Sequence, residues 1–264
     1  MNEKDSRSKL LYNFGNNLIT IGNLDRPMDC RDRDENWFVA EVANEFIHLP
    51  YDTFLIPFLK ELSVPTKSTE PDDVKRVRCW DLKESYLKSD RTSHQTGLSV
   101  QSDLTILLDD YSVLFEFKKP HSTHSQNKVE LKQLGRQILL ANKHIQKYDL
   151  DNFKIILINN SAPLVHMPNR GTIDPNKIFM DYFESDDHWL EHPAVESLLD
   201  GFDPKDLEQP FIVKTWTELI ETSISVIDDA KKDYDDKGIK KMFENSKSSL
   251  EWFLERREHL LDEY

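Results

Sequence analysis

The segment SDLTILLDDYSVLFEFKKP, residues 102–120, decides the fold of this chain. Asp103 opens an apolar run, an Asp-Asp turn follows, and a second apolar run ends in Glu116 and Lys118, two residues apart. Side chains alternate between the faces of a strand, so Glu116 and Lys118 emerge on one face and their phenylalanine neighbours on the other. A hairpin would set Asp103 beside them. The segment therefore predicts two paired strands that bring two acids and a lysine together.

This grouping of charges indicates metal chemistry. Two carboxylates and an ammonium group at one point of an apolar sheet are costly to bury unless a cation and an anionic substrate neutralise them. Asp103 and Glu116 would hold Mg²⁺ or Mn²⁺, because hard cations prefer carboxylate oxygens and leave positions for water and phosphate. Lys118 would orient or deprotonate the attacking water, or stabilise charge that develops on the phosphate. The pattern indicates metal-dependent phosphodiester cleavage.

An acid followed by any residue and Lys is a weak signal by itself, because the chain has 48 Asp and Glu residues. Glu116/Lys118 differs from the other such pairs because it lies in an apolar, strand-like segment with an acid leading the preceding run. The alternative interpretation of Asp103, Glu116 and Lys118 is a surface hairpin with an ion pair at a strand edge. The other pairs lie in polar surroundings typical of solvated ion pairs: Asp73/Lys75, Asp81/Lys83, Glu130/Lys132, Asp203/Lys205, Asp229/Lys231 and Asp235/Lys237.

With these residues, the segment resembles the PD-(D/E)XK nuclease superfamily, whose motif is an acid on one strand and an acid-any-Lys on the next. The resemblance covers residues 37–160. Ser102 stands where the motif has Pro, and the Pro71-Asp72 dipeptide, in a polar stretch, competes as the first acid. The resemblance implies a restriction-endonuclease-like α/β core, with a central mixed sheet flanked by helices. It also implies DNA or RNA as substrate and the main-chain carbonyl of Phe117 as a further metal ligand.

The superfamily often adds an acid from its first helix. Glu41 and Glu45 lie one turn apart on the helix that we expect over residues 34–49, beside its apolar stripe. The resemblance implies that either could be a further metal ligand, and His48, one turn later, is a weaker candidate. The alternative is a capped helix end with solvated glutamates.

Gln133 and Gln137 lie one turn apart on the helix that follows the Lys118 strand. They resemble the helix glutamine of exonuclease-like members, which helps to place the substrate and the metal-bound water. The tyrosine expected four residues after that glutamine is replaced by Gln137, so the chain departs from that subgroup. A polar flank beside a core stripe is the alternative. Lys119, next to the motif lysine, is expected to contact the phosphate backbone.

Hydrophobic periodicity predicts the other elements. The expected order of helix, three strands, helix and strand is the core order of the resembled superfamily, so element order and motif position agree. Residues 216–264 are typical of two or three charged helices broken near Gly238. We expect helices over residues 34–49, 53–62 and 129–148, and strands over residues 74–80, 98–108, 112–118, 153–158 and 211–215.

The chain divides into a polar N-terminal arm (residues 1–33), a nuclease-like core (34–160) and a C-terminal extension (161–264) that is mostly helical and acidic. The net charge of −14 is unevenly spread. Residues 111–154 carry eight Lys and Arg against four Asp and Glu, whereas residues 181–264 carry ten against 23. Nucleic acid is therefore expected near the motif segment. The acidic helices are a solvated surface, a dimer surface or a site for a protein partner.

Composition excludes several other classes. Cys30 and Cys79 are too few for a disulfide framework and lack metal-site spacing. With no apolar stretch of about 18 to 20 residues and a polar N-terminus, we expect an intracellular protein, nuclear or cytoplasmic, without a membrane partner. Seven glycines give little support to folds that bind nucleotides through glycine turns. The alternative functions are a catalytically silent nuclease-like fold that binds nucleic acid or protein, and an interaction protein acting through the acidic helices.

Overall fold

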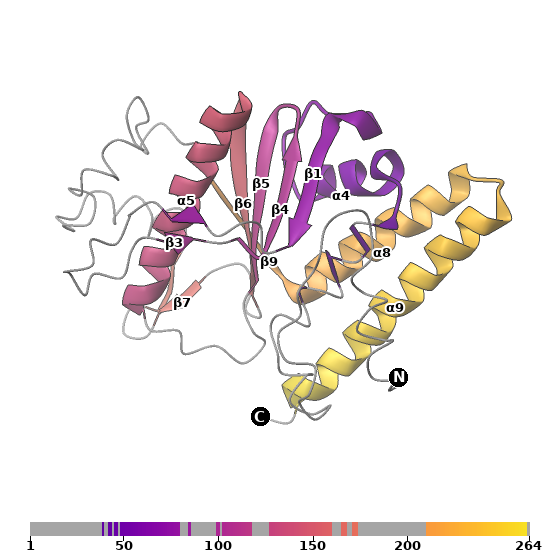
Figure 1. The fold of residues 1–264 in the computed structure, drawn as a ribbon. Helices are drawn as coiled ribbons and strands as arrows, with labels where there is room; N and C mark the ends of the chain where they lie inside the picture. The colour runs from indigo at the N-terminus through magenta and orange to yellow at the C-terminus, as the bar shows by residue number, and fades with distance from the viewer. Residues whose placement is uncertain are drawn as a thin grey trace, which may run out of the picture.

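The described part of the chain forms an α/β structure with one five-stranded mixed sheet between helices (Figure 1). The order of strands in this sheet is β1-β4-β5-β6-β9. The β1/β4 and β4/β5 pairs are antiparallel, and the β5/β6 and β6/β9 pairs are parallel. This confirms the expected central mixed sheet flanked by helices. The computed structural model describes residues 39, 42–43, 45–46, 48–79, 84–85, 99–100, 102–117, 127–159, 165–167, 171–173 and 210–262.

The sheet strands lie close to the expected positions. The two strands of the motif hairpin are buried at every residue, which is typical of strands covered on both faces. The sheet consists of β1 (Val74–Cys79), β4 (Leu104–Leu108), β5 (Tyr111–Phe117), β6 (Asn152–Asn159) and β9 (Phe211–Thr215). Two small sheets pair β2 (Glu84–Ser85) with β3 (Ser99–Val100) and β7 (Val165–Met167) with β8 (Gly171–Ile173).

Helices cover both faces of the sheet (Figure 1). The long helix α5 (Asn127–Tyr148) lies on one face, while α4 (Ile56–Glu61) and α8 (Trp216–Asp233) lie on the other, and α9 (Lys237–Asp262) packs against α8. The short turns η1 (Tyr51–Leu55) and η2 (Pro71–Asp73) precede α4 and β1. The described residues of the first expected helix are helical, except Leu49 at its end: Val39, Val42, Ala43, Glu45, Phe46 and His48. None of the helices in the described ranges is long and apolar enough to cross a membrane.

The structure corrects the strand expected over residues 98–108. Its first part, β3, pairs with β2 in a separate sheet, and β4 begins only at Leu104. Ser102 explains the interruption, because its hydroxyl donates to the Leu104 carbonyl at 2.7 Å and lies 3.0 Å from the Thr105 hydroxyl. Such local side-chain bonds compete with the hydrogen bonds of a strand ladder.

The core lies on both faces of the sheet. On the α5 face, Leu114 packs with side chains from α5, β6 and β9. On the opposite face, Phe115 and Phe117 join a larger cluster that includes α4, α8 and α9. The indole of Trp216, at the start of α8, stacks on Phe117 with 5.1 Å between ring centroids. The C-terminal extension therefore supplies both a strand of the sheet and part of the core.

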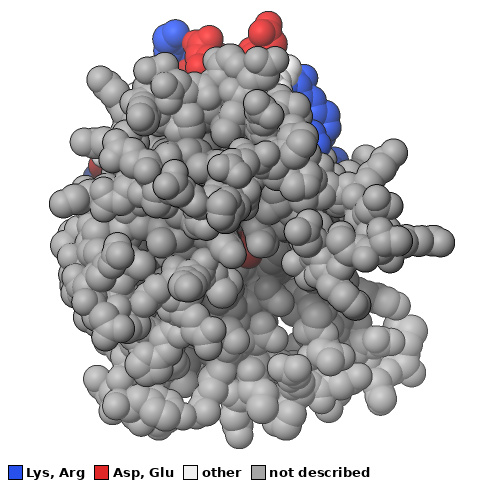
Figure 2. All heavy atoms as spheres, turned by 90° about the vertical axis from the view of Figure 1, so that its left-hand side faces the viewer, with Lys and Arg blue, Asp and Glu red and all other residues white. Residues whose placement is uncertain are grey.

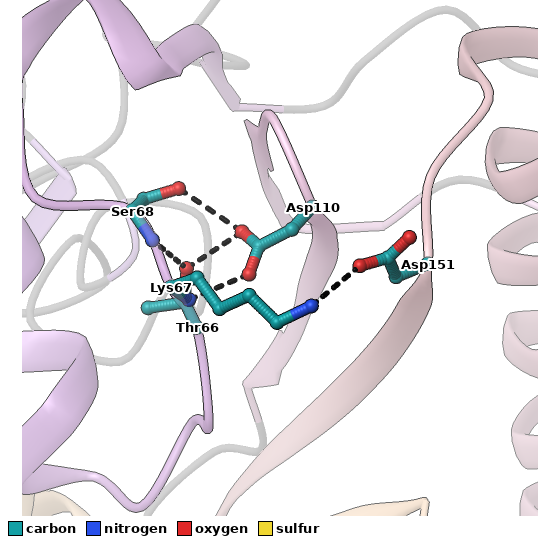
Figure 3. A network of polar contacts seen from close by, with 5 residues as sticks. All are labelled: Thr66, Lys67, Ser68, Asp110 and Asp151. Carbon is teal, nitrogen blue, oxygen red and sulfur yellow. Dashed lines mark hydrogen bonds and ion pairs between the residues drawn. The ribbon is translucent and has the colours of Figure 1, made fainter.

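The buried Asp110, in the β4–β5 turn, forms hydrogen bonds with residues 66–68, which precede β1 (Figure 3). Asp110 accepts hydrogen bonds from the Thr66 hydroxyl at 2.7 Å, the Lys67 amide at 2.6 Å and the Ser68 hydroxyl at 3.0 Å. Its main-chain carbonyl also accepts from the amides of Asp151 and Asn152 at the start of β6. Hydrogen bonds to an ionised group are stronger than those between neutral groups, so this contact anchors residues 44 positions apart in the sequence.

We expect Asp110→Ala to lower the free energy of unfolding by about 3 kcal/mol, because it leaves several buried donors without their charged acceptor. Urea denaturation measures this change. Asp151→Ala is the matched control, since its 3.1 Å ion pair with Lys67 is exposed and should contribute less than about 1 kcal/mol. Equal losses in the two variants would show that the Asp110 network does not stabilise the fold.

Candidate active site

The β4–β5 hairpin sets Asp103 opposite Glu116. Leu104 pairs with Phe115 and Thr105 with Leu114, so continuing this antiparallel register by one residue pairs Asp103 with Glu116. The Asp103 carboxylate accepts a hydrogen bond from the Phe117 amide at 2.8 Å. This bond holds the Asp103 side chain at the end of β5. The Asp103 carboxylate therefore lies at the backbone of β5, at the residue that follows Glu116 in the sequence.

Glu116 points to the α5 face and is buried. Its carboxylate is 2% exposed and accepts a hydrogen bond of 2.7 Å from the Gln137 amide nitrogen, whose side chain is fully buried. Gln137 is held there because its neighbour Ile138 packs into the core between α5 and the sheet. In the adjacent strand β6, the residue beside Glu116 is the apolar Leu157.

Burial of the Glu116 carboxylate in these apolar surroundings costs free energy. An ionised carboxylate in an apolar row of a sheet loses much of its hydration, and the neutral amide of Gln137 does not balance its charge. A cation that binds both Glu116 and Asp103 would offset this cost. Figure 2 views the molecule from the left-hand side of Figure 1, and a small acidic patch is visible near the centre of the view.

Glu45 is also buried, with 5% of its surface exposed. Its neighbour Phe46 lies 6.0 Å from Phe115 between ring centroids, so the helical segment packs against the face of β5 that is opposite to Glu116. Glu45 is therefore buried next to a segment that contacts β5, and its role as a metal ligand stays a prediction. His48 is half-buried on the same segment.

The structure brings together three of the predicted site residues: Asp103, Glu116 and Gln137. The helix glutamine that contacts the motif acid is Gln137, and Ala141, four residues later, packs in the core. Apart from Glu45, the other predicted site residues lie outside the part that the structure describes: Glu41, Lys118, Lys119 and the side chain of Gln133.

Sequence reasoning missed a second polar contact between α5 and the sheet. The Ser112 hydroxyl lies 2.9 Å from the Nδ1 atom of His144, and both side chains are buried. The Tyr148 ring meets the His144 ring edge-on, and the Tyr148 hydroxyl accepts from the Arg76 guanidinium at 3.0 Å. These bonds tie α5 to β1 and β5. The alternation of Ser112, Leu114 and Glu116 along one strand face is the signal that places Ser112 against α5.

The donor set fits a hard divalent cation. Asp103 and Glu116 each accept a hydrogen bond at one carboxylate oxygen, and a carboxylate has about four lone-pair sites, so accepting this bond is compatible with coordination. Within the described ranges, no group of three or more His, Cys, Asp or Glu side chains is arranged to hold a metal ion. Two carboxylates would form a site that water and a substrate phosphate complete.

Comparison of the chain with protein-family models, with curated proteins and with solved structures gives no match. The chemistry of the site must therefore be inferred from its own geometry. The features that bear on function are the paired acids at the end of the hairpin, the glutamine that orients one of them, and the order of the elements that carry them.

Proposed function

We propose that this chain is a divalent-metal-dependent nuclease that hydrolyses phosphodiester bonds of DNA or RNA. The observation that carries the proposal is the buried Glu116, bonded to Gln137, with the Asp103 carboxylate held at the amide of the next residue, Phe117. A buried acid such as Glu116, beside the half-buried Asp103, is costly in a protein that does not use these acids. They are typical of metal sites that act on phosphate.

The order of the elements supports a restriction-endonuclease-like core. Apart from η1, α4, η2 and the small β2/β3 sheet, the described elements run from the helical segment with Glu45 through β1, β4 and β5 to α5 and β6. The first three strands are antiparallel neighbours, and β6 returns parallel to β5 after α5. This is the arrangement that the motif resemblance implies, and β9, α8 and α9 would be additions to it.

In the proposed site, Asp103 and Glu116 hold Mg²⁺ or Mn²⁺, and Glu45 is the candidate for a further ligand. The bound ion would supply Lewis-acid stabilisation of the phosphate and lower the pKa of a bound water. Gln137 orients the Glu116 carboxylate, and the Phe117 amide orients that of Asp103. Lys118, the residue after β5, would orient the attacking water, as the motif resemblance implies.

A catalytically silent fold is the second candidate. The observation that favours it is that both acids already accept hydrogen bonds from the protein, so each has a structural partner. In that case the fold would bind nucleic acid, or bind a protein partner or a second copy through the charged C-terminal helices α8 and α9. Metal binding and cleavage separate the two candidates.

The proposed function is tested by incubating the full chain with labelled single-stranded and double-stranded DNA and RNA, with Mn²⁺ or with EDTA. We expect cleavage of at least one substrate in Mn²⁺ and none in EDTA. Intact substrates under all conditions, together with binding of one of them, would favour the silent fold.

Calorimetry should detect weak Mn²⁺ binding to the wild type and none to the Asp103→Ala/Glu116→Ala double variant. The affinity is expected to be modest because substrate phosphate completes the coordination. The matched control is Asp109→Ala/Asp151→Ala, which removes two exposed carboxylates that pair with Lys75 and Lys67. Mn²⁺ binding that persists in the Asp103/Glu116 double variant would place the metal elsewhere.

A further inference from the structure

The edge strand β1 places two arginines on the face that carries the candidate site. Arg76 pairs with Leu107, and Arg78 pairs with Thr105. Directly opposite residues of an antiparallel pair share a face, and Thr105 in turn pairs with Leu114 on the α5 face. Both arginines therefore emerge on the side of the sheet where Glu116 lies.

Arg78 lies in the row next to the acids. Asp103 is two residues from Thr105 along β4, so Arg78 and Asp103 are diagonal neighbours, for which Cα atoms are about 7–8 Å apart. Thr105, the residue opposite Arg78, has a short side chain. It is fully buried, and its hydroxyl lies 3.0 Å from that of Ser102. Along this row of the five described strands, Arg78 is the one charged residue.

We propose that Arg78 binds a backbone phosphate of the substrate strand, next to the phosphate that is cleaved at Asp103 and Glu116. This inference rests on the proposed function and adds the direction in which the strand leaves the site, over β4 toward β1. A guanidinium presents a planar fork of donors that matches two phosphate oxygens. Arg78 is half-buried, and partial removal from water strengthens its attraction to phosphate.

Arg76 has a different role. Its guanidinium donates to the Tyr148 hydroxyl at 3.0 Å and lies 5.5 Å from the centre of the Tyr148 ring. These contacts bind Arg76 to the C-terminal end of α5, one row farther from the acids than Arg78. Arg76 is therefore a matched control: it is an arginine on the same strand and the same face, but one row farther from the acids.

The test compares Arg78→Gln, Arg78→Lys and Arg76→Gln in the full chain, using the substrate that the wild type cleaves best. We expect Arg78→Gln to raise KM about tenfold with kcat within about twofold, and to flatten the dependence of binding on salt by about one unit of slope. Arg78→Lys should keep the salt slope and recover part of the affinity, because it keeps the charge and loses the fork. Arg76→Gln should leave both KM and the slope near the wild-type values.

Three results would overturn this role of Arg78. They are an unchanged KM and salt slope in Arg78→Gln, an equal loss in Arg76→Gln, or a loss in Arg78→Gln that appears only in kcat. Thermal unfolding of each variant identifies a folding defect. If Arg78→Gln has such a defect, the KM and the salt slope of Arg78→Lys decide whether Arg78 binds phosphate. If the wild type cleaves and Arg78→Gln matches it, only this inference fails, whereas a wild type that neither cleaves nor binds any nucleic acid contradicts the proposed function as well.

Discussion

Glu116→Gln is expected to lower the single-turnover rate of metal-dependent cleavage by at least about a hundredfold, because it replaces a charged metal ligand by a neutral amide. The fold should survive the change. The glutamine carbonyl still accepts the hydrogen bond from Gln137, and the substitution removes a buried charge, so the free energy of unfolding should change by less than about 1 kcal/mol. Asp103→Asn should have a similar effect on the rate and keep an acceptor for the Phe117 amide.

The matched control for this prediction is Glu221→Gln, the same chemical change at an exposed position of α8. It should cleave at the wild-type rate. Cleavage by Glu116→Gln at the rate of Glu221→Gln would remove Glu116 from the site.

Trp216→Ala should lower the free energy of unfolding by about 3–5 kcal/mol, the usual cost of truncating a large buried aromatic residue. Trp216 is fully buried, stacks on Phe117 at the end of β5 and lies 6.0 Å from Phe253 of α9 between ring centroids. Its loss would therefore leave a cavity where the sheet, α8 and α9 meet. Chemical denaturation measures the change.

Trp252→Ala provides the comparison, because Trp252 is 46% exposed and its truncation should cost less than about 1 kcal/mol. Equal losses for Trp216→Ala and Trp252→Ala would mean that the C-terminal helices do not stabilise the sheet. The contacts of Trp216 also imply that deleting residues after it would uncover the core. Point substitutions are thus the better test of what the acidic helices do.

Local patterns in the sequence predict most of the elements. The alternation in the motif segment predicts the hairpin, and the spacing of apolar residues predicts α5, whose residues Ile138 and Ala141 are buried. The break between the last two helices is misplaced by only a few residues. Gly238 lies inside α9, and the helix begins where the Asp236 side chain accepts from the amides of Gly238 and Ile239. A capping aspartate, rather than the glycine, determines this boundary.

The contacts that build the site join residues far apart in the chain, so local patterns do not reveal them. Gln137 is 21 residues from Glu116, and the choice between Gln133 and Gln137 depends on how α5 crosses the sheet. The position of Arg78 depends on the pairing of β1 with β4. The sequence predicts β1 as a strand but does not predict which strand it pairs with. Periodicity predicts which face a residue takes, whereas register and helix placement decide its neighbours.

The most direct test of the proposed site is the single-turnover cleavage rate as a function of Mn²⁺ concentration for the wild type, Glu116→Gln and Glu221→Gln. We expect the rate to rise with Mn²⁺ and to saturate in the wild type and in Glu221→Gln, to vanish in EDTA, and to stay near the background in Glu116→Gln at every concentration. A Glu116→Gln variant that cleaves as fast as the wild type, or wild-type cleavage that persists in EDTA, would contradict a metal site at Asp103 and Glu116.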